Sequence, residues 1–225
     1  MHQRAAAWAP TGRQEAGGPT AAAERDDDLP LLRAGEAGDT RALERLLARH
    51  ERALCLLCGG MLVDRSTAGV RHTLNGAEAE DAVQETFLRA LRALHAGRGF
   101  RGDSTVRTWL FRIAINVCLE WRRRARFSPF PSFLALDDVD AHAADPGPSP
   151  EAAVLRAWQA REALRVLPPR HRALLLLKER EGWSVREIAA AMGWTDKKVH
   201  NELYKARVRL AEWRAAQEIE ERNGR

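Results

Sequence analysis

Residues 182–213 read GWSVREIAAAMGWTDKKVHNELYKARVRLAEW, a pattern of two helices joined by a tight turn. Ser184 and Glu187 have capping-box spacing, in which each side chain can bond a free backbone N–H at a helix start. Gly193 then supplies a residue that tolerates positive φ where a helix stops and the chain turns. Thr195 can cap the helix that follows. The stretch therefore predicts a helix-turn-helix.

Apolar residues of the second helix recur at alternating steps of four and three, which places them on one face. These residues, which we expect to be buried, are Val199, Leu203, Ala206, Leu210 and Trp213. The opposite face is polar and basic, as suits a helix whose first turns meet base edges in the major groove. Its expected DNA-contacting residues are Thr195, Lys197, Lys198, His200, Asn201, Tyr204, Lys205 and Arg207. For this helix alone, a solvated amphipathic helix in a bundle is the alternative.

Composition limits the class of protein. The 225 residues, 45% of them hydrophobic, suffice for one or two domains with real cores. The net charge of +5 favours a polyanionic partner such as nucleic acid. No apolar run approaches the roughly 20 residues of a membrane span, and the N-terminus lacks a signal-peptide pattern. We therefore expect a cytoplasmic protein without membrane insertion.

Three cysteines are too few for a disulfide scaffold and indicate a reducing compartment. Cys55 and Cys58 form a C-x-x-C inside an apolar helical run, and no second pair of cysteines or histidines completes a zinc set. We interpret them as small buried hydrophobes, with redox sensing as the alternative. Because no phosphate-cradling glycine loop and no grouping of Ser, His and Asp occurs either, we expect neither a cofactor nor enzymatic activity.

Helical periodicity without a long strand pattern predicts an all-α fold of two small helical domains joined by a flexible linker. Residues 1–28 lack periodicity and are expected to form a disordered tail. The first domain is expected over 29–126. Residues 127–152 are rich in proline and aspartate and predict the linker. The second domain, 153–225, contains the helix-turn-helix.

The first domain ends in a second basic surface. Residues 98–126 contain eight arginines and only two acidic residues. A helix is expected from Thr105 to about Arg126, capped by Asp103 or Ser104.

Four motifs occur in one order: GDTRAL at 38–43, EDAVQETFLRA at 80–90, FRGDSTVRTWLFRIAIN at 100–116 and LPPRHR at 167–172. In this order they resemble the bacterial RNA polymerase sigma factors of the extracytoplasmic-function group of the sigma-70 family. The resemblance implies two helical domains, called region two and region four, that act in transcription initiation. The loop at 64–76 is longer than is usual in this family.

The resemblance also implies roles for exposed residues. Asp81, Gln84 and Glu85 would dock on the coiled coil of the polymerase beta-prime subunit, and region four would contact the beta flap. Region two would trap a base flipped from the minus-ten element and hold nearby phosphates. The residues implied for this are Arg98, Arg101, Trp109, Arg112, Asn116, Arg122, Arg123 and Arg124. Trp109 could equally belong to the core.

Region four would read the minus-thirty-five element, with Lys198, Asn201 and Lys205 nearest the bases and Arg207 on phosphate. Glu202 stands where the family often has arginine, and a carboxylate there could accept from cytosine or repel phosphate. The promoter sequence is therefore not predicted. Because family members are commonly held inactive by an anti-sigma factor, the resemblance implies such a partner as well.

Two other classes fit parts of the sequence. A stand-alone helix-turn-helix regulator would carry an N-terminal domain that senses a ligand or dimerises, and it would bind duplex DNA tightly by itself. A recombinase would need a nucleophile flanked by arginines in a folded catalytic domain, and the N-terminal half offers no convincing candidate.

Overall fold

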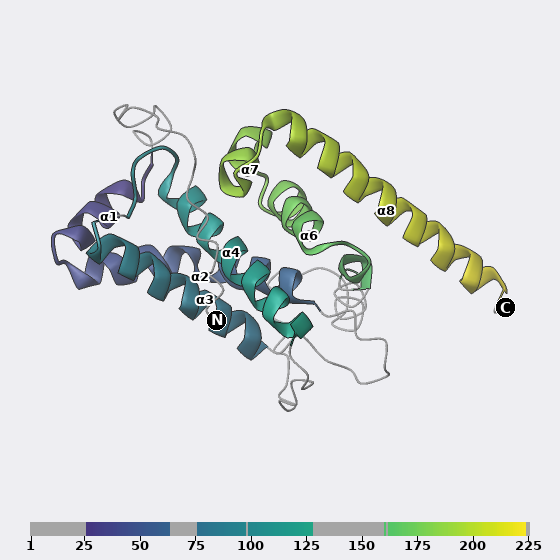
Figure 1. Ribbon diagram of the computed structural model, residues 1–225, viewed down its shortest axis with the longest axis horizontal. Coiled ribbons are helices and arrows are strands. Elements are labelled where there is room, and N and C mark those ends of the chain that lie inside the picture. Colours follow the sequence, from purple (N-terminus) through teal and green to yellow (C-terminus); the bar gives the residue numbers. More distant parts are fainter. Residues whose placement is uncertain (1–25, 64–75, 98, 128–159, 161, 224–225) are drawn as a thin grey trace, which may run out of the picture.

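The computed structural model describes residues 26–63, 76–97, 99–127, 160 and 162–223 (Figure 1). Its helices are α1 (Leu29–Glu36), α2 (Thr40–Leu62), α3 (Gly76–His95), α4 (Val106–Phe127), α6 (Pro169–Leu175), the π-helix η1 (Leu176–Arg180), α7 (Val185–Met192) and α8 (Asp196–Asn223). These ranges contain no strand, which confirms the all-α class. The predicted linker beyond Phe127, the 64–75 loop and most of the predicted tail lie outside the described residues.

The first helical unit consists of α1 to α4, in which α2 packs against α1, α3 and α4. Every third or fourth residue of α2 is buried, as the helical period requires when one face contacts a core. The buried residues are Ala42, Leu46, His50, Leu54, Leu57, Cys58 and Met61. Burial of each leucine side chain contributes about 1.5–3 kcal/mol, so this stripe holds the unit together.

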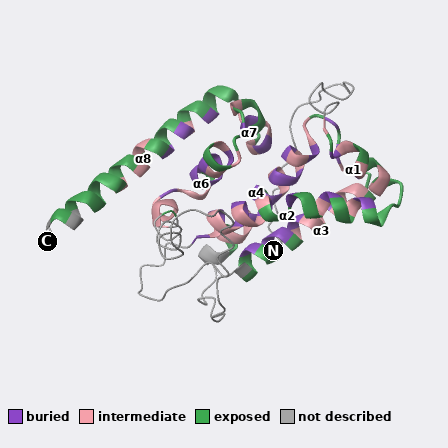
Figure 2. Cartoon of the chain, turned by 180° about the vertical axis from the view of Figure 1, so that it is seen from behind, coloured by how far each residue is buried: buried purple, intermediate pink, exposed green. Residues whose placement is uncertain are grey.

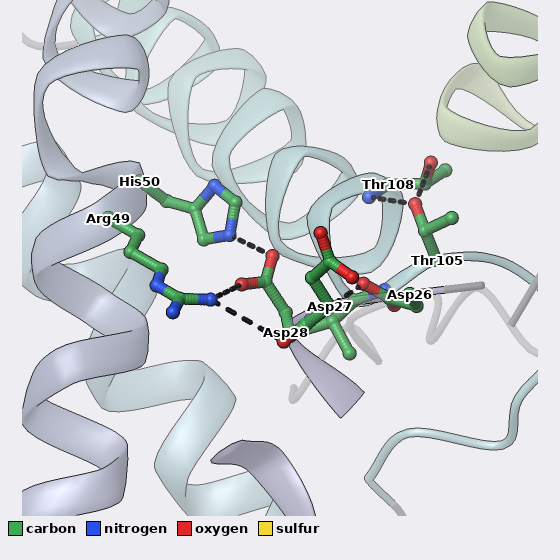
Figure 3. A network of polar contacts seen from close by, with 8 residues as sticks. Asp26, Asp27, Asp28, Arg49, His50, Thr105 and Thr108 are labelled. Atoms are coloured by element: carbon green, nitrogen blue, oxygen red, sulfur yellow. Dashed lines mark hydrogen bonds and ion pairs between the residues drawn. The ribbon is translucent and has the colours of Figure 1, made fainter. Parts of the chain in front are cut away.

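Residues 26–28 belong to this unit, so the expected tail over 1–28 extends too far. His50 donates a hydrogen bond of 2.6 Å to Asp28, and Arg49 donates one of 3.0 Å to the same carboxylate (Figure 3). Asp26 accepts a hydrogen bond from the backbone N–H of Val106 at the start of α4. These aspartates bind specific donors on α2 and α4, and a composition-based prediction could not include such contacts.

The cap of α4 also differs from the prediction. The hydroxyl oxygen of Thr105 accepts a hydrogen bond of 3.1 Å from the backbone N–H of Thr108, and Asp26 binds the N–H of Val106. Asp103 and Ser104 were expected to cap this helix, and Ser104 instead donates to the carbonyl of Thr105. Two orphan N–H groups of α4 are thus satisfied, one locally and one from the N-terminal segment.

The second unit contains the predicted helix-turn-helix. Ser184 and Glu187 form the capping box at the start of α7, with the Ser184 hydroxyl accepting from the Glu187 N–H at 3.2 Å. Gly193 ends α7 with φ of 66°, in the left-handed region. Thr195 then accepts a hydrogen bond of 3.3 Å from the N–H of Lys198. All three local predictions are confirmed.

The apolar face of α8 is buried over its first three turns only. Val199, Leu203 and Ala206 are buried, whereas Leu210 and Trp213 are half-buried. Figure 2 shows the reason: the second half of α8 extends away from the rest of the molecule and is mostly exposed.

One hydrophobic core joins the two units, whereas the sequence predicted domains held only by a tether. Buried residues of α2 and α4, including Met61 and Phe111, belong to the same cluster as Leu174, Leu177 and Ile188 of the second unit. Of the two cysteines predicted to be buried small hydrophobes, Cys58 lies in this cluster and is fully buried, whereas Cys55 is half-buried and packs against it. Cys118 is also fully buried in the cluster. A smaller cluster lies between α1, α2, α3 and α4. The two units therefore form a single packed body.

Candidate nucleic-acid and protein interfaces

The polar face at the start of α8 is open to solvent. Lys197, Lys198, His200, Asn201 and Tyr204 are exposed, and Tyr204 has a relative exposure of 71%. The ammonium group of Lys198 lies 4.6 Å from the ring centroid of Trp194, a cation–π contact that orients the lysine at the helix start. Thr195 is also exposed. The exposed residues Thr195, Lys197 and Lys198 therefore lie at the positive end of the helix dipole, where an anion is favoured.

Other predicted contacts on α8 are engaged in ion pairs. Lys205 donates to Glu202 at 2.7 Å, and His171 of α6 donates to the same carboxylate at 2.7 Å. These two hydrogen bonds, that of Lys205 first, lower the pKa of Glu202 to about 2. Arg207 pairs with Glu179 at 2.7 Å. In this arrangement Glu202 is bound by two donors of its own unit, so its carboxylate positions α8 against α6.

Some of the residues that were predicted to bind the minus-ten element are exposed. Arg101, Asn116, Arg123 and Arg124 are open to solvent, the last three along α4. Arg98 lies outside the described residues. The exposed arginines provide a cationic surface on the C-terminal part of α4, as phosphate binding would require.

Three other residues predicted to bind the minus-ten element are not exposed to solvent. Arg112 is half-buried and donates a hydrogen bond of 2.6 Å to the carbonyl of Ala190 in α7, and burial lowers the pKa of its guanidinium. Arg122 donates to the carbonyl of Val63 at 2.7 Å, just beyond α2. Trp109 packs edge-on against Phe100 with ring centroids 6.0 Å apart, at the smaller core. The structure thus favours the core alternative for Trp109.

Two arginines contact the other unit in a way that was not predicted from the sequence. Arg107 of α4 pairs with Glu181 at 2.8 Å, and its guanidinium lies 5.0 Å from the ring centroid of Trp183. Arg172 of α6 is completely buried and donates to the carbonyls of Met61 and Val63. No sequence signal identifies these roles, because arginine is ordinarily a surface residue.

The exposed face of α3 carries the residues implied for protein docking. Asp81 and Gln84 are exposed, whereas Glu85 is half-buried and accepts a hydrogen bond of 2.7 Å from Arg89. Leu88, one helical turn after Gln84, has a relative exposure of 46%. This face combines acidic, amide and apolar groups.

A basic cavity of about 480 Å³ lies where the end of α4 meets the starts of α6 and α8. Its lining residues are Leu119, Arg122, Arg123, Pro168, Pro169, Arg170, His171, Trp194, Lys198 and Glu202.

Within the described ranges, no group of three metal-binding side chains occurs. None of the helices in those ranges is long and apolar enough to cross a membrane.

A helix-turn-helix with an exposed basic helix, beside a helical unit with further exposed arginines, defines a DNA-binding protein of the helix-turn-helix class. The Sigma-70 region 2 family matches residues 66–128, and the Sigma-70 region 4 family matches residues 157–210. The chain belongs to the sigma-70 family, as an RNA polymerase sigma factor of the extracytoplasmic-function group.

Relatives of similar length support this assignment. The chain is 34% identical to the ECF RNA polymerase sigma factor SigM of Mycobacterium tuberculosis, over 82% of this chain and 83% of the relative. It is 31% identical to the RNA polymerase sigma-H factor of Pseudomonas aeruginosa, over 81% and 91%. Among solved structures, CnrH in complex with the cytosolic domain of CnrY is similar, with a TM-score of 0.60 and 26% identity, over 85% of this chain and 99% of that one.

Proposed function

We propose that this sigma factor binds core RNA polymerase through the exposed face of α3 and directs it to promoters through α8 and the basic residues of α4. One observation carries the proposal: a single chain presents both an acidic and amide face, with Asp81 and Gln84 exposed on α3, and a helix-turn-helix with an open basic face. A stand-alone regulator would require only the second of these surfaces.

In this proposal α8 enters the major groove at the minus-thirty-five element. Lys198, Asn201 and Tyr204 are the groups nearest the bases, because they are exposed in the first turns of the helix. Lys205 was expected nearest the bases, but because it is paired with Glu202 we assign it, together with Arg207, to phosphate binding, after both exchange their carboxylate partners for the DNA backbone. Glu202, bound to His171, is assigned a positioning role.

Promoter opening is binding chemistry in this proposal. Unstacking a base costs a few kcal/mol, and capture of the flipped base together with polymerase contacts offsets that cost. Arg101, Asn116, Arg123 and Arg124 supply a track for the displaced strand and the adjacent duplex. The reaction itself takes place in the polymerase. The chain would therefore act in the cytoplasm, without catalytic groups of its own.

An anti-sigma factor is the second proposed partner. The structurally similar CnrH is bound to the cytosolic domain of CnrY, and the RpoE structure from Bartonella quintana, similar in fold at a TM-score of 0.55, contains the anti-sigma factor NepR. We assign region two to residues 26–127, because Asp26 binds the start of α4 and α4 ends at Phe127, the linker to 128–152 and region four to 153–225.

Run-off transcription with purified core polymerase on promoter fragments from the source genome tests the function. The wild type is compared with an Asp81→Arg, Gln84→Ala double variant and with Glu44→Arg, a charge reversal at an exposed position of α2. We expect specific transcripts with the wild type and Glu44→Arg, and none with the double variant. Tight duplex binding without any polymerase-dependent transcript would instead establish the stand-alone regulator.

A further inference from the structure

The basic cavity of about 480 Å³ is lined by residues of both helical units. Arg123 lines it from the C-terminal half of α4, Arg170 from the first turn of α6, and Lys198 from the first turn of α8. Pockets of roughly 300 to 1,000 Å³ are typical of small-molecule sites in proteins. The cavity is therefore large enough for an organic ligand with several functional groups.

Three cationic side chains of this cavity have no carboxylate partner within the described ranges. They are Arg123, Arg170 and Lys198, and all three are exposed. The charged groups of Arg170 and Lys198 instead lie 5.7 and 4.6 Å from the ring centroid of Trp194. A cation–π contact orients a cation without supplying a counter-ion. Three helices thus contribute positive charge that is not neutralised to one cavity.

Glu202 is the one carboxylate among the described residues that line the cavity. It accepts hydrogen bonds of 2.7 Å from Lys205 and from His171, so its charge is already balanced within the second unit. A concave surface lined by one sign of charge concentrates ions of the opposite sign. Guanidinium and ammonium groups bind phosphate through charge-assisted hydrogen bonds. The cavity therefore suits an anion with two or more phosphate groups.

The rest of the lining is largely apolar. Leu119, Pro168, Pro169 and the half-buried Trp194 contribute to it. Burial of an organic ring against such a surface is favourable, whereas a purely inorganic anion would leave the surface in contact with water. A nucleotide combines both kinds of group in one molecule, because it carries charged phosphates and a flat base.

His171 adds a hydrogen-bonding group to the same lining. The residue is 6% exposed, and its Nδ1 has no hydrogen-bond partner in the part of the chain that the structure describes. Buried polar atoms ordinarily have a partner. A nucleotide offers one in either protonation state, since phosphate oxygens accept from a charged imidazole and ribose hydroxyls donate to a neutral one.

We propose that this cavity binds a nucleoside diphosphate or triphosphate, with the phosphates held by Arg123, Arg170 and Lys198 and the base packed against the apolar lining. DNA binding does not account for the whole cavity. Arg123 and Lys198 are candidate DNA contacts, but Arg170 belongs to neither of the two candidate DNA-contacting surfaces. The site is independent of the proposed function, because its occupancy requires neither polymerase nor promoter.

Binding is measured on the full-length chain by fluorescence anisotropy of ADP that carries a methylanthraniloyl label, in buffer with EDTA. Unlabelled ADP, pyrophosphate and adenosine are the competitors. We expect ADP to displace the labelled nucleotide about tenfold more effectively than pyrophosphate or adenosine, because each of these lacks one part of the contacts.

A first pair of variants separates the cavity from general electrostatic attraction. Arg170→Glu places a carboxylate in the first turn of α6, which the helix dipole favours, and it should weaken ADP binding about tenfold or more. Arg214→Glu makes the same charge change on the exposed second half of α8 (Figure 2), where we expect affinity to stay within about twofold of the wild type. Circular dichroism melts confirm that each variant is folded.

A second pair separates the cavity from DNA binding. Arg123→Ala should weaken ADP binding about tenfold, whereas Arg124→Ala, at the next position of α4 and outside the cavity, should keep the wild-type affinity for ADP. Both arginines are exposed candidate DNA contacts, so a difference between the two variants reports on the cavity.

The proposal is overturned if ADP does not compete with the labelled nucleotide, if pyrophosphate competes as well as ADP, or if Arg214→Glu weakens binding as much as Arg170→Glu. Equal losses for Arg123→Ala and Arg124→Ala would identify the cavity as part of a DNA-binding surface only, which also overturns it. Run-off transcription tests the proposed function separately, because it does not depend on nucleotide binding to this chain.

Discussion

His171 of α6 donates a 2.7 Å hydrogen bond to Glu202 of α8, linking the helix that follows the linker to the helix that carries the candidate DNA-contacting face. His171 is buried, and Glu202 also accepts from Lys205 on its exposed side. The half-buried carboxylate therefore holds α8 against α6. Sequence alone left it as a possible base contact.

Glu202→Gln should reduce stability at neutral pH and lose its effect in acid. The folded-state pKa of about 2 lies below the ordinary value of 4.5, so the stabilisation is present above pH 4.5 and is lost as pH falls through about 2. Because the pair is near the surface, we expect the variant to lower the free energy of unfolding at neutral pH by less than about 1 kcal/mol. Thermal melts of the variant and wild type between pH 7 and pH 3 should converge toward the acidic end. Glu218→Gln, an exposed control on α8, should show no such convergence.

Arg172→Leu should be among the most destabilising substitutions in the chain. The Arg172 guanidinium donates to the carbonyls of Leu167, Met61 and Arg165, at 3.0, 3.2 and 3.3 Å. Leucine would leave these groups unpaired in a buried site, at a cost of about 3 kcal/mol or more in the free energy of unfolding. Urea denaturation measures the loss. Arg170→Leu, an exposed neighbour on α6, should cost far less, and equal losses for the two variants would contradict the assignment.

Two serine-to-alanine substitutions distinguish a helix cap from a surface hydroxyl. Ser184→Ala removes the acceptor for the Glu187 N–H and breaks the capping box of α7, which should cost about 1 kcal/mol. Ser104→Ala should cost little, because the cap of α4 is provided by Thr105 and Asp26. Chemical denaturation gives both values. A larger loss at Ser104 than at Ser184 would show that the caps are wrongly assigned.

Adjacent glycines in α2 should respond differently to alanine. A Cβ at Gly59 would lie 3.7 Å from the Cβ of Ala79, which is an ordinary contact. Gly59→Ala should therefore raise the free energy of unfolding by up to about 1 kcal/mol, because alanine has the higher helix propensity. A Cβ at Gly60 would lie 2.6 Å from Cδ1 of Leu176, which belongs to the second unit. Gly60→Ala should therefore gain less or destabilise, because Leu176 must move. Equal gains in urea denaturation would mean that the two units are not packed at this point.

The helix-turn-helix could be predicted from sequence because its signals are local. The capping box spans Ser184 to Glu187, and the turn depends on one glycine, Gly193, whose φ is 66°. The apolar period of α8 correctly identified Val199 and Leu203 as buried. Signals of this kind depend on neighbours within one or two helical turns, so they can be recognised in the sequence without knowledge of the tertiary fold.

The docking of the two units could not be predicted in the same way. Glu181 and Arg107 are 74 residues apart, and Arg112 and Ala190 are 78 apart. The spacing of apolar residues around Trp183 in the sequence is the same whether the side chain is buried within its own unit or against the other unit. Local sequence patterns therefore do not distinguish the arginines that bind α7 or α2 from those that stay exposed on α4.

The carboxylate of Asp26, which binds the N–H of Val106 from 80 positions earlier in the chain, has a consequence for the order of folding. During synthesis Asp26 leaves the ribosome long before α4 exists, so the start of α4 is completed only by a late, non-local encounter. Contacts of such high sequence separation slow folding relative to a bundle with local caps. We expect the N-terminal segment and α4 to be the last parts of the first unit to gain protection from hydrogen exchange.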